Sequence, residues 1–312
     1  MSTHLLLSLG TRGPARPPVI VIGMHRSGTS MLAGMLAELG LFIGARTDHN
    51  NESPLFLALE RRLLRHSGGS WQYPQVLSPL LKDAAARAVA TDYFRRALVS
   101  PHIIGYLGWS RYLRYRTPAN LDIPWGWKSP VTTYMLPLWL DLFPESRVIH
   151  LYRHGVDVAQ SLRVRAEREH EAVRRRLHIS RKLLYWHWRI ISLERGFSLW
   201  EAYLTQARHH LRALQHQAYE LKYEDVLADP APALQSLVAF CGLQATEEEI
   251  ACVARRTRPE RAYAYRDSPE LLRFAARVAP RLHALGYAAL GPTDSGRRHV
   301  PGRDDARTAV GR

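Results

Sequence analysis

Cysteine, acidic side chains and long apolar runs are all scarce in this sequence, and each shortage excludes a class of protein. Two cysteines, Cys241 and Cys252, occur in 312 residues, too few for a disulfide framework and without the spacing of a metal site. No apolar run approaches the roughly 20 residues that a membrane helix needs, and the first residues lack the basic start of a signal peptide. We therefore expect free thiols in a reducing cytoplasm and no transmembrane segment.

Acidic residues are outnumbered, with 28 Asp and Glu against 43 Lys and Arg, which gives a net charge of +15. Such an excess of positive charge could bind nucleic acid or a polyanionic cofactor, or it could simply form a solvated basic surface. Arginine is spread along the whole chain, which favours the basic surface as the largest contributor. Because the sequence has no zinc-finger spacing, basic heptad region or aromatic RNA-binding signature, we expect no specific nucleic-acid partner. A basic nucleic-acid-binding module stays as the weakest alternative.

Short β-branched runs alternate with longer helical patterns along the chain. Strands are expected at 19–22, 123–127, 146–152 and 218–223. This alternation predicts an α/β fold with a central parallel sheet of about four to five strands flanked by helices, like that of P-loop NTPases. Helices are expected from residue 29 and at 55–65, 79–99, 101–116, 132–143, 155–168, 177–214 with a break near Gly196, 230–242, 246–257 and 268–286.

The composition also predicts how the chain is divided. Residues 1–17 are expected to form a flexible arm, and 18–290 a single α/β domain with helical insertions. The Gly, Pro, Arg and Asp content of residues 291–312 predicts a disordered tail. The conspicuous polar residues follow the expected strands, where ligands of such sheets collect.

The first such segment runs from Pro18 to Leu36. Val19 to Ile22 suits a buried strand, Gly23 to Gly28 is a glycine-punctuated loop, and an apolar pattern with helical spacing begins at Thr29. This order is typical of a phosphate-binding loop, in which successive backbone N–H groups and a helix N-terminus face one anion. The alternative is a glycine turn that leads into an ordinary helix.

The loop differs from a Walker A loop, G-x-x-x-x-G-K-[ST], at one position. Thr29 occupies the place of the lysine and Ser30 follows it, while the cation, Arg26, lies inside the loop. The loop therefore lacks the lysine that clamps a magnesium triphosphate, and we expect a different anion. A P-loop-type small-molecule kinase remains an alternative.

A second anion site is expected where Arg153 ends the third strand and Ser161 follows on the next helix. A guanidinium and a hydroxyl that point at one position suit a phosphate monoester. The alternative is a surface arginine beside an exposed serine.

Taken in order, these motifs resemble the sulfotransferases that use 3′-phosphoadenosine 5′-phosphosulfate (PAPS). The matching segments are GMHRSGTS after the first strand, SRVIHLYRHGVDVAQSL around Arg153, and, more weakly, LKYEDVLADP at 221–230. The resemblance covers roughly Pro18 to Gly242 and implies a P-loop-like fold. It places the 3′-phosphate on Arg153 and Ser161 and the adenine near Tyr223, which could equally be a core aromatic. It places the 5′-phosphosulfate on Arg26, Ser27, Gly28, Thr29 and Ser30.

The resemblance also implies the reaction: an acceptor hydroxyl or amine attacks sulfur, and no metal is needed. Arg26 and Lys128, the lysine of GWKSP at a strand end, would stabilise charge near the sulfuryl group. Lys128 could instead be a surface lysine. Pro130 stands where many relatives carry a histidine, so the candidate base is Glu52.

The base, the adenine contact and the acceptor have alternatives. His25 and His49 rival Glu52 as the base. Met31 replaces a tryptophan that stacks on adenine in many relatives. The family's glycine-rich basic loop is not evident, although an arginine cluster could substitute for it: Arg255, Arg256, Arg258 and Arg261. The acceptor is an unidentified small molecule, lipid or carbohydrate, and the oligomeric state is unknown. Some aromatic residues could line an acceptor cleft or belong to the core: Trp71, Tyr73, Trp109, Trp125 and the aromatics of 183–200.

Overall fold

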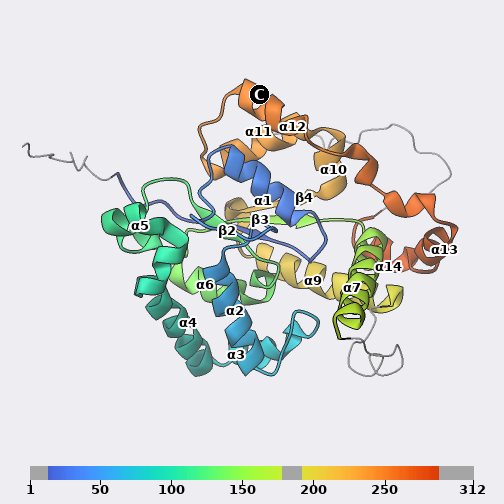
Figure 1. The fold of residues 1–312 in the computed structure, drawn as a ribbon, viewed down its shortest axis with the longest axis horizontal. Coiled ribbons are helices and arrows are strands. Elements are labelled where there is room, and N and C mark those ends of the chain that lie inside the picture. The colour runs from blue at the N-terminus through green and yellow to red at the C-terminus, as the bar shows by residue number, and fades with distance from the viewer. Residues whose placement is uncertain (1–12, 178–191, 288–312) are drawn as a thin grey trace, which may run out of the picture.

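The computed structural model describes residues 13–177 and 192–287. Its centre is a parallel four-stranded sheet in the order β2-β1-β3-β4 (Figure 1). The strands are β1 (Val19–Ile22), β2 (Gly126–Lys128), β3 (Arg147–Tyr152) and β4 (Ala218–Lys222). The predicted α/β fold with a central parallel sheet is therefore confirmed.

Both faces of the sheet are covered, as the run of β-branched residues in β1 requires. All four residues of β1 are buried. Ile20 and Ile22 belong to one apolar core and Val19 and Val21 to another, because successive side chains of a strand point to opposite faces. A strand in this position needs apolar residues on both sides.

The helices form a layer on each face (Figure 1). One layer contains α1 (Thr29–Glu38), α10 (Tyr223–Ala228), α11 (Pro230–Cys241) and α12 (Glu247–Ala254). The opposite core is built from α2 (Pro54–His66), α3 (Leu77–Lys82), α4 (Ala84–Val99), α5 (Ile104–Tyr115), α6 (Thr132–Leu142), α7 (Gly155–Leu177), α9 (Leu193–Leu211), α13 (Pro269–Arg277) and α14 (Ala279–Ala284). Short 3₁₀ segments lie at Pro74–Val76, Pro101–Ile103, Pro118–Asn120, Gln215–Gln217, Pro259–Arg261 and Ala264–Asp267.

Several expected boundaries were wrong. The helix expected at 79–99 is two helices, because Asp83 ends α3 and its side chain accepts the Ala86 N–H at the start of α4. The region 268–286 is likewise divided into α13 and α14. The break expected near Gly196 lies at Ser192, whose side chain accepts the Arg195 N–H at the start of α9. Gly196 itself is buried inside α9, and a Cβ there would lie 3.1 Å from the Ala159 Cα. The glycine allows α9 to pack closely on α7.

The N-terminal segment is attached to the domain where it is described. The Arg16 N–H donates to the Leu121 carbonyl at 2.7 Å, and the Trp125 indole donates to the Arg16 carbonyl at 2.8 Å. The rest of the expected arm, the stretch 178–191 and the expected tail 291–312 lie outside the described residues. Among the helices that the structure describes, none combines the length and apolarity needed to span a bilayer. Cys241 is buried, Cys252 is exposed, and both are free thiols.

Candidate active site

The loop after β1 is held tightly against its neighbours. Gly23 has φ +148°, and a Cβ there would lie 2.3 Å from the Leu151 carbonyl oxygen of β3. Gly28 has φ +91°, and a Cβ there would lie 2.3 Å from the Tyr223 ring. Both positions therefore require glycine, for conformation and for space. The close fit fixes the loop's backbone beside the carboxyl end of the sheet, where α1 begins at Thr29.

A cavity of about 450 Å³ opens at this edge of the sheet. Eight of the residues expected at the site line it: Arg26, Gly28, Thr29, Ser30, Glu52, Lys128, Arg153 and Tyr223. Ser27 is fully buried instead, so its side chain does not reach the cavity. Ser161 lines an adjoining cavity that shares four arginines with the first: Arg26, Arg153, Arg165 and Arg261.

Lys128 and Glu52 form a buried ion pair at the end of β2. The Lys128 ammonium lies 2.7 Å from Glu52 Oε1, and their side chains are 1% and 6% exposed. The ammonium also donates to Ser30 Oγ at 3.2 Å. Burial lowers the pKa of Lys128, while the charge of Glu52 opposes this shift. The candidate base and the candidate lysine are thus already in contact.

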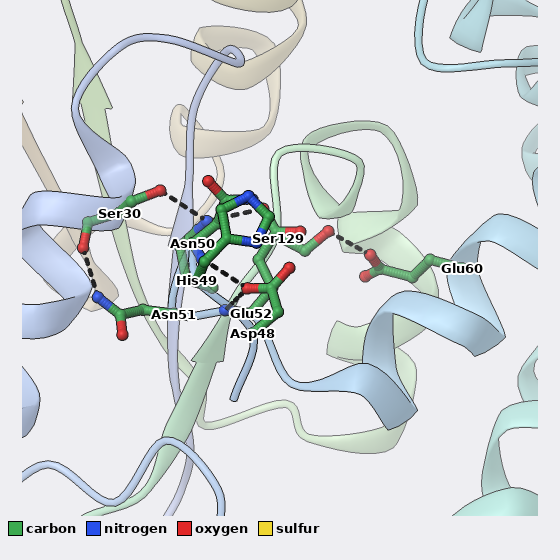
Figure 2. Close-up of polar contacts among 9 residues, drawn as sticks. Ser30, Asp48, His49, Asn50, Asn51, Glu52, Glu60 and Ser129 are labelled. Atoms are coloured by element: carbon green, nitrogen blue, oxygen red, sulfur yellow. Dashed lines mark hydrogen bonds and ion pairs between the residues drawn. The ribbon is translucent and has the colours of Figure 1, made fainter. Parts of the chain in front are cut away.

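The segment that carries Glu52 is an ordered turn (Figure 2). Asp48 Oδ1 accepts the backbone N–H groups of Asn50 and Glu52 at 2.8 and 2.9 Å. The Asn51 amide donates to the Ser30 carbonyl at 2.9 Å and so ties the turn to the start of α1. Although this segment is neither helix nor strand, its hydrogen bonds hold the backbone of Glu52 in a defined position.

A second carboxylate lies behind this pair and was not predicted. Glu60 of α2 is fully buried and accepts hydrogen bonds from Ser129 at 2.5 Å, from Trp139 at 2.9 Å and from Thr132. Burial raises the pKa of Glu60 to about 7, although the three donors act in the opposite direction. Figure 2 shows Glu60 reaching Ser129, the residue after Lys128. A sequence signal existed, because Glu60 interrupts the apolar stripe of the helix expected at 55–65.

The expected second anion site lies next to the loop. The Arg26 guanidinium donates to Ser161 Oγ at 2.8 Å. The Arg153 guanidinium lies 4.9 Å from the centre of the Tyr223 ring, forms an ion pair with Asp157 at 3.3 Å and donates to the Arg261 carbonyl at 2.8 Å. Its side chain is 13% exposed, so it faces the cavity rather than bulk water.

Positively charged side chains dominate the part of the cavity around Arg26 and Arg153. Burial lowers the pKa of Arg26, and the neighbouring charges of Arg165 and Arg153 add to the effect. Three members of the arginine cluster, Arg256, Arg258 and Arg261, also line the cavity. Such an arrangement favours an anionic ligand, since each added negative charge would relieve repulsion among the guanidinium groups.

The two histidine rivals occupy different positions. His25 lines the cavity, with its ring centre 4.9 Å from that of Trp71. Burial, followed by the charges of Arg165, Lys128, Arg61 and Arg26, lowers the pKa of His25 to about 3. His49 is exposed, does not line the cavity and pairs with the Asn50 amide. Of the aromatics considered for an acceptor cleft, Trp71 alone lines this cavity among those that the structure describes, while Trp125 and Trp200 are fully buried. The part of 183–200 before residue 192 lies outside the described residues. No group of three His, Cys, Asp or Glu side chains within residues 13–177 and 192–287 is placed to hold a metal ion.

Some proteins of known structure are similar to this chain. Three solved structures are similar: the sulfotransferase domain from the curacin biosynthetic pathway, that from the Synechococcus PCC 7002 olefin synthase, and a sulfotransferase from Alicyclobacillus acidocaldarius. Their identities to this chain are 18%, 18% and 17%, with TM-scores of 0.47, 0.47 and 0.42. The matches cover 86%, 86% and 88% of this chain and 99%, 96% and 98% of the respective structures. No curated protein matches the chain in a sequence search. The sequence profile of the sulfotransferase family matches residues 17–248, well over half of the chain, and the chain therefore belongs to the sulfotransferase family.

Proposed function

We propose that this enzyme transfers a sulfuryl group from PAPS to a hydroxyl or amine of a small-molecule, lipid or carbohydrate acceptor. The observation that carries the proposal is the continuity of one cavity, from Tyr223 and Arg153, past the Gly23–Ser30 loop, to the Lys128–Glu52 pair. This is the order in which a 3′-phosphate, a 5′-phosphosulfate and an acceptor would follow one another. With the family known, the kinase and nucleic-acid alternatives are no longer needed.

The residues present fit a nucleotide with two anionic groups. Arg153 Nε is buried and has no hydrogen-bond partner among the described residues, so a donor is available on the side where a 3′-phosphate would lie. Ser161 Oγ is held by Arg26, which leaves its hydroxyl proton to donate to an anion. Arg258 and Arg261 would contact the 3′-phosphate in place of the glycine-rich basic loop. Gly28 permits the approach of Tyr223, whose ring would border the adenine.

The donor supplies an activated sulfuryl group, and adenosine 3′,5′-bisphosphate is the leaving group. Arg26 and the amides that follow it would hold the 5′-phosphosulfate at the start of α1. Lys128 would balance the charge that develops on the bridging oxygen. Glu52 would accept the proton of the acceptor hydroxyl or amine.

The ion pair links these two roles. While Glu52 is ionised, it holds the Lys128 ammonium at 2.7 Å. A proton that arrives on Glu52 removes this attraction and leaves the ammonium free to turn to the leaving oxygen. Deprotonation of the acceptor and stabilisation of the leaving group would then assist each other. The free thiols of Cys241 and Cys252 suit a reducing compartment, and we propose the cytoplasm as the location.

The test is the binding of adenosine 3′,5′-bisphosphate and adenosine 5′-monophosphate to wild type and to Arg153→Ala, measured by titration calorimetry. Losing a charge-assisted contact to the 3′-phosphate should cost ~1.5–3 kcal/mol, or about 10- to 150-fold in affinity, for the bisphosphate alone. Arg147→Ala is the control, because Arg147 lies at the opposite end of the same strand and contacts the Phe240 carbonyl. Equal losses for both nucleotides, or no binding of the bisphosphate to wild type, would contradict the proposal.

A further inference from the structure

The cavity has two ends with different surroundings. At the Tyr223 end, the charges that act on the Tyr223 hydroxyl are chiefly those of Arg153 and Arg261. At the other end, which we call the Trp71 end (His25, Arg61, Trp71 and Arg165), the charges that act on His25 are those of Arg165, Lys128, Arg61 and Arg26. Because the proposed function assigns the Tyr223 end to the nucleotide, the Trp71 end is left for the acceptor.

Two arginines of the Trp71 end are not among the residues assigned to the nucleotide, although Arg165 also borders the adjoining cavity that contains Ser161. Arg61 of α2 lines the cavity and has no acidic partner in the part of the chain that the structure describes. Arg165 of α7 lies 6.0 Å from the centre of the Trp71 ring and pairs with Glu169 at 2.7 Å. That pair is between exposed residues four positions apart on one helix, an arrangement that adds little stability and that a bound anion can replace.

Acidic side chains are nearly absent from the lining of the cavity among the described residues. Glu52 is the only acidic side chain, within the described residues, that lines the cavity, and Lys128 already neutralises it. An anion that enters the Trp71 end therefore meets two guanidinium groups and no free carboxylate. A neutral acceptor would gain nothing from these charges, whereas an anionic one would be attracted and oriented by them.

The floor of this end adds shape and a polar contact. The Trp71 ring packs edge-on against His25 and offers an apolar surface for a ring or sugar face. His25 Nε2 is buried and has no hydrogen-bond partner among the described residues. A neutral imidazole in this position can pair with one hydroxyl of an acceptor while the arginines bind a charged group farther out.

We propose, on the basis of the proposed function, that the acceptor is a small-molecule alcohol or phenol that also carries an oxyanion, and that Arg61 and Arg165 bind this oxyanion at the Trp71 end. A carboxylate, a sulfate ester and a phosphate monoester share the required chemistry, since each offers two or more oxygens to a planar guanidinium. Arg61 and Arg165 then determine acceptor specificity, while Lys128 and Glu52 act on any acceptor that binds.

The experiment compares acceptor pairs that differ in charge: two carboxylates with amides of nearly the same shape, and one phosphate ester with the parent alcohol. The pairs are 4-hydroxybenzoate with 4-hydroxybenzamide, methyl glucuronide with its amide, and glycerol phosphate with glycerol. Binding to the complex with saturating adenosine 3′,5′-bisphosphate is measured by calorimetry, and transfer is measured with labelled donor. We expect the anionic member of at least one pair to bind ~10-fold or more tightly than its partner, and the pair that responds identifies carboxylate or phosphate as the source.

Matched variants assign the effect to the two arginines. Arg61→Ala should reduce the preference for the anionic member ~10-fold and leave bisphosphate affinity unchanged, because Arg61 does not line the adjoining cavity that contains Ser161. Arg165→Ala should reduce the preference by a similar factor, and its bisphosphate affinity is measured alongside because Arg165 lines both cavities. Arg62→Ala is the control for Arg61, because this neighbour on α2 lines a separate groove. Arg175→Ala is the control for Arg165, because it removes a similar exposed pair, with Glu171, elsewhere on α7.

The inference is overturned if neutral members bind as well as anionic ones, if no anionic member binds, or if the control variants lose the preference equally. Each of these results leaves the proposed function standing when the bisphosphate still binds. If the bisphosphate itself does not bind wild type, the proposed function fails first, so the two failures are distinguished in one titration.

Discussion

Replacement of Lys128 by methionine should destabilise the fold strongly and in a pH-dependent way. The change keeps an unbranched side chain of similar length but removes the charge that faces Glu52. Glu52 is 6% exposed, so its carboxylate would remain buried without a cation. Breaking a buried ion pair by removing one partner costs about 3–5 kcal/mol, which is a large part of the 5–15 kcal/mol typical of a native domain.

The sign of the pH dependence follows from proton binding. An unpaired buried carboxylate disfavours its charged form, so the native variant binds a proton more tightly than the unfolded chain does. Stability of the variant therefore falls as pH rises. We expect the full loss at pH 8 and a smaller loss at pH 5, measured by urea unfolding with tryptophan fluorescence at constant m-value.

A double-mutant cycle with Glu52→Gln isolates the pair from other effects of the substitutions. The control pair is Arg96 with Asp92, which has a similar separation of 2.6 Å but side chains that are 81% and 41% exposed, and its coupling should be about 0.3–0.5 kcal/mol. A Lys128–Glu52 coupling no larger than that of the control, or a loss that does not change between pH 5 and pH 8, would refute the reasoning.

Two other substitutions test residues that support the site: Glu60 behind the ion pair and Gly28 in the loop after β1. Because burial raises the pKa of Glu60 from about 4.5 to about 7, the native state binds this proton more tightly, and Glu60 lowers stability progressively as pH rises through this interval. Glu60→Gln should therefore flatten the fall in melting temperature between pH 5 and pH 7.5, seen by calorimetry. Gly28→Ala places a Cβ 2.3 Å from the Tyr223 ring at φ +91°, so it should cost ~1–3 kcal/mol and weaken binding of adenosine 3′,5′-bisphosphate.

Each of these changes has its own check. For Glu60→Gln, an unchanged pH profile would show that Glu60 does not titrate in this interval. For Gly28→Ala, the control is Gly40→Ala, since Gly40 also has a positive φ, +102°, but its Cβ would meet open space. Similar nucleotide affinity in the two glycine variants would mean that contact with Tyr223 does not matter for the loop.

The elements with local signals were predictable from sequence. The β-branched run of β1, the glycines of its loop and the apolar spacing of α1 are encoded within 20 consecutive residues, and they appear as expected. The break expected near Gly196 lies four residues earlier, at Ser192. The sequence shows that a glycine is flexible, but it does not show the neighbour that needs the small size of Gly196. At Gly196 that neighbour is Ala159, 37 positions earlier.

The parts of the site that depend on distant contacts could not be predicted in the same way. The hydrogen bond between Arg26 and Ser161 joins residues 135 positions apart, and no local pattern reports it. Eight tryptophans occur in the chain, and periodicity cannot show that Trp71 borders the cavity while Trp125 is buried. Glu60 could have been found as a charged residue on an apolar stripe, but its partners Ser129, Thr132 and Trp139 come from another part of the chain.

The central position of β1 has a consequence for how this enzyme could diversify. This strand is bonded to β2 on one side and to β3 on the other, so the loop at its end follows an inner strand whose backbone is fixed on both sides. Arg61 and Trp71 instead come from α2 and the turn that follows it, outside that ladder. Replacing residues 61–73 could change what is sulfated without disturbing how sulfate is delivered, which makes this stretch the natural place to graft a new acceptor preference.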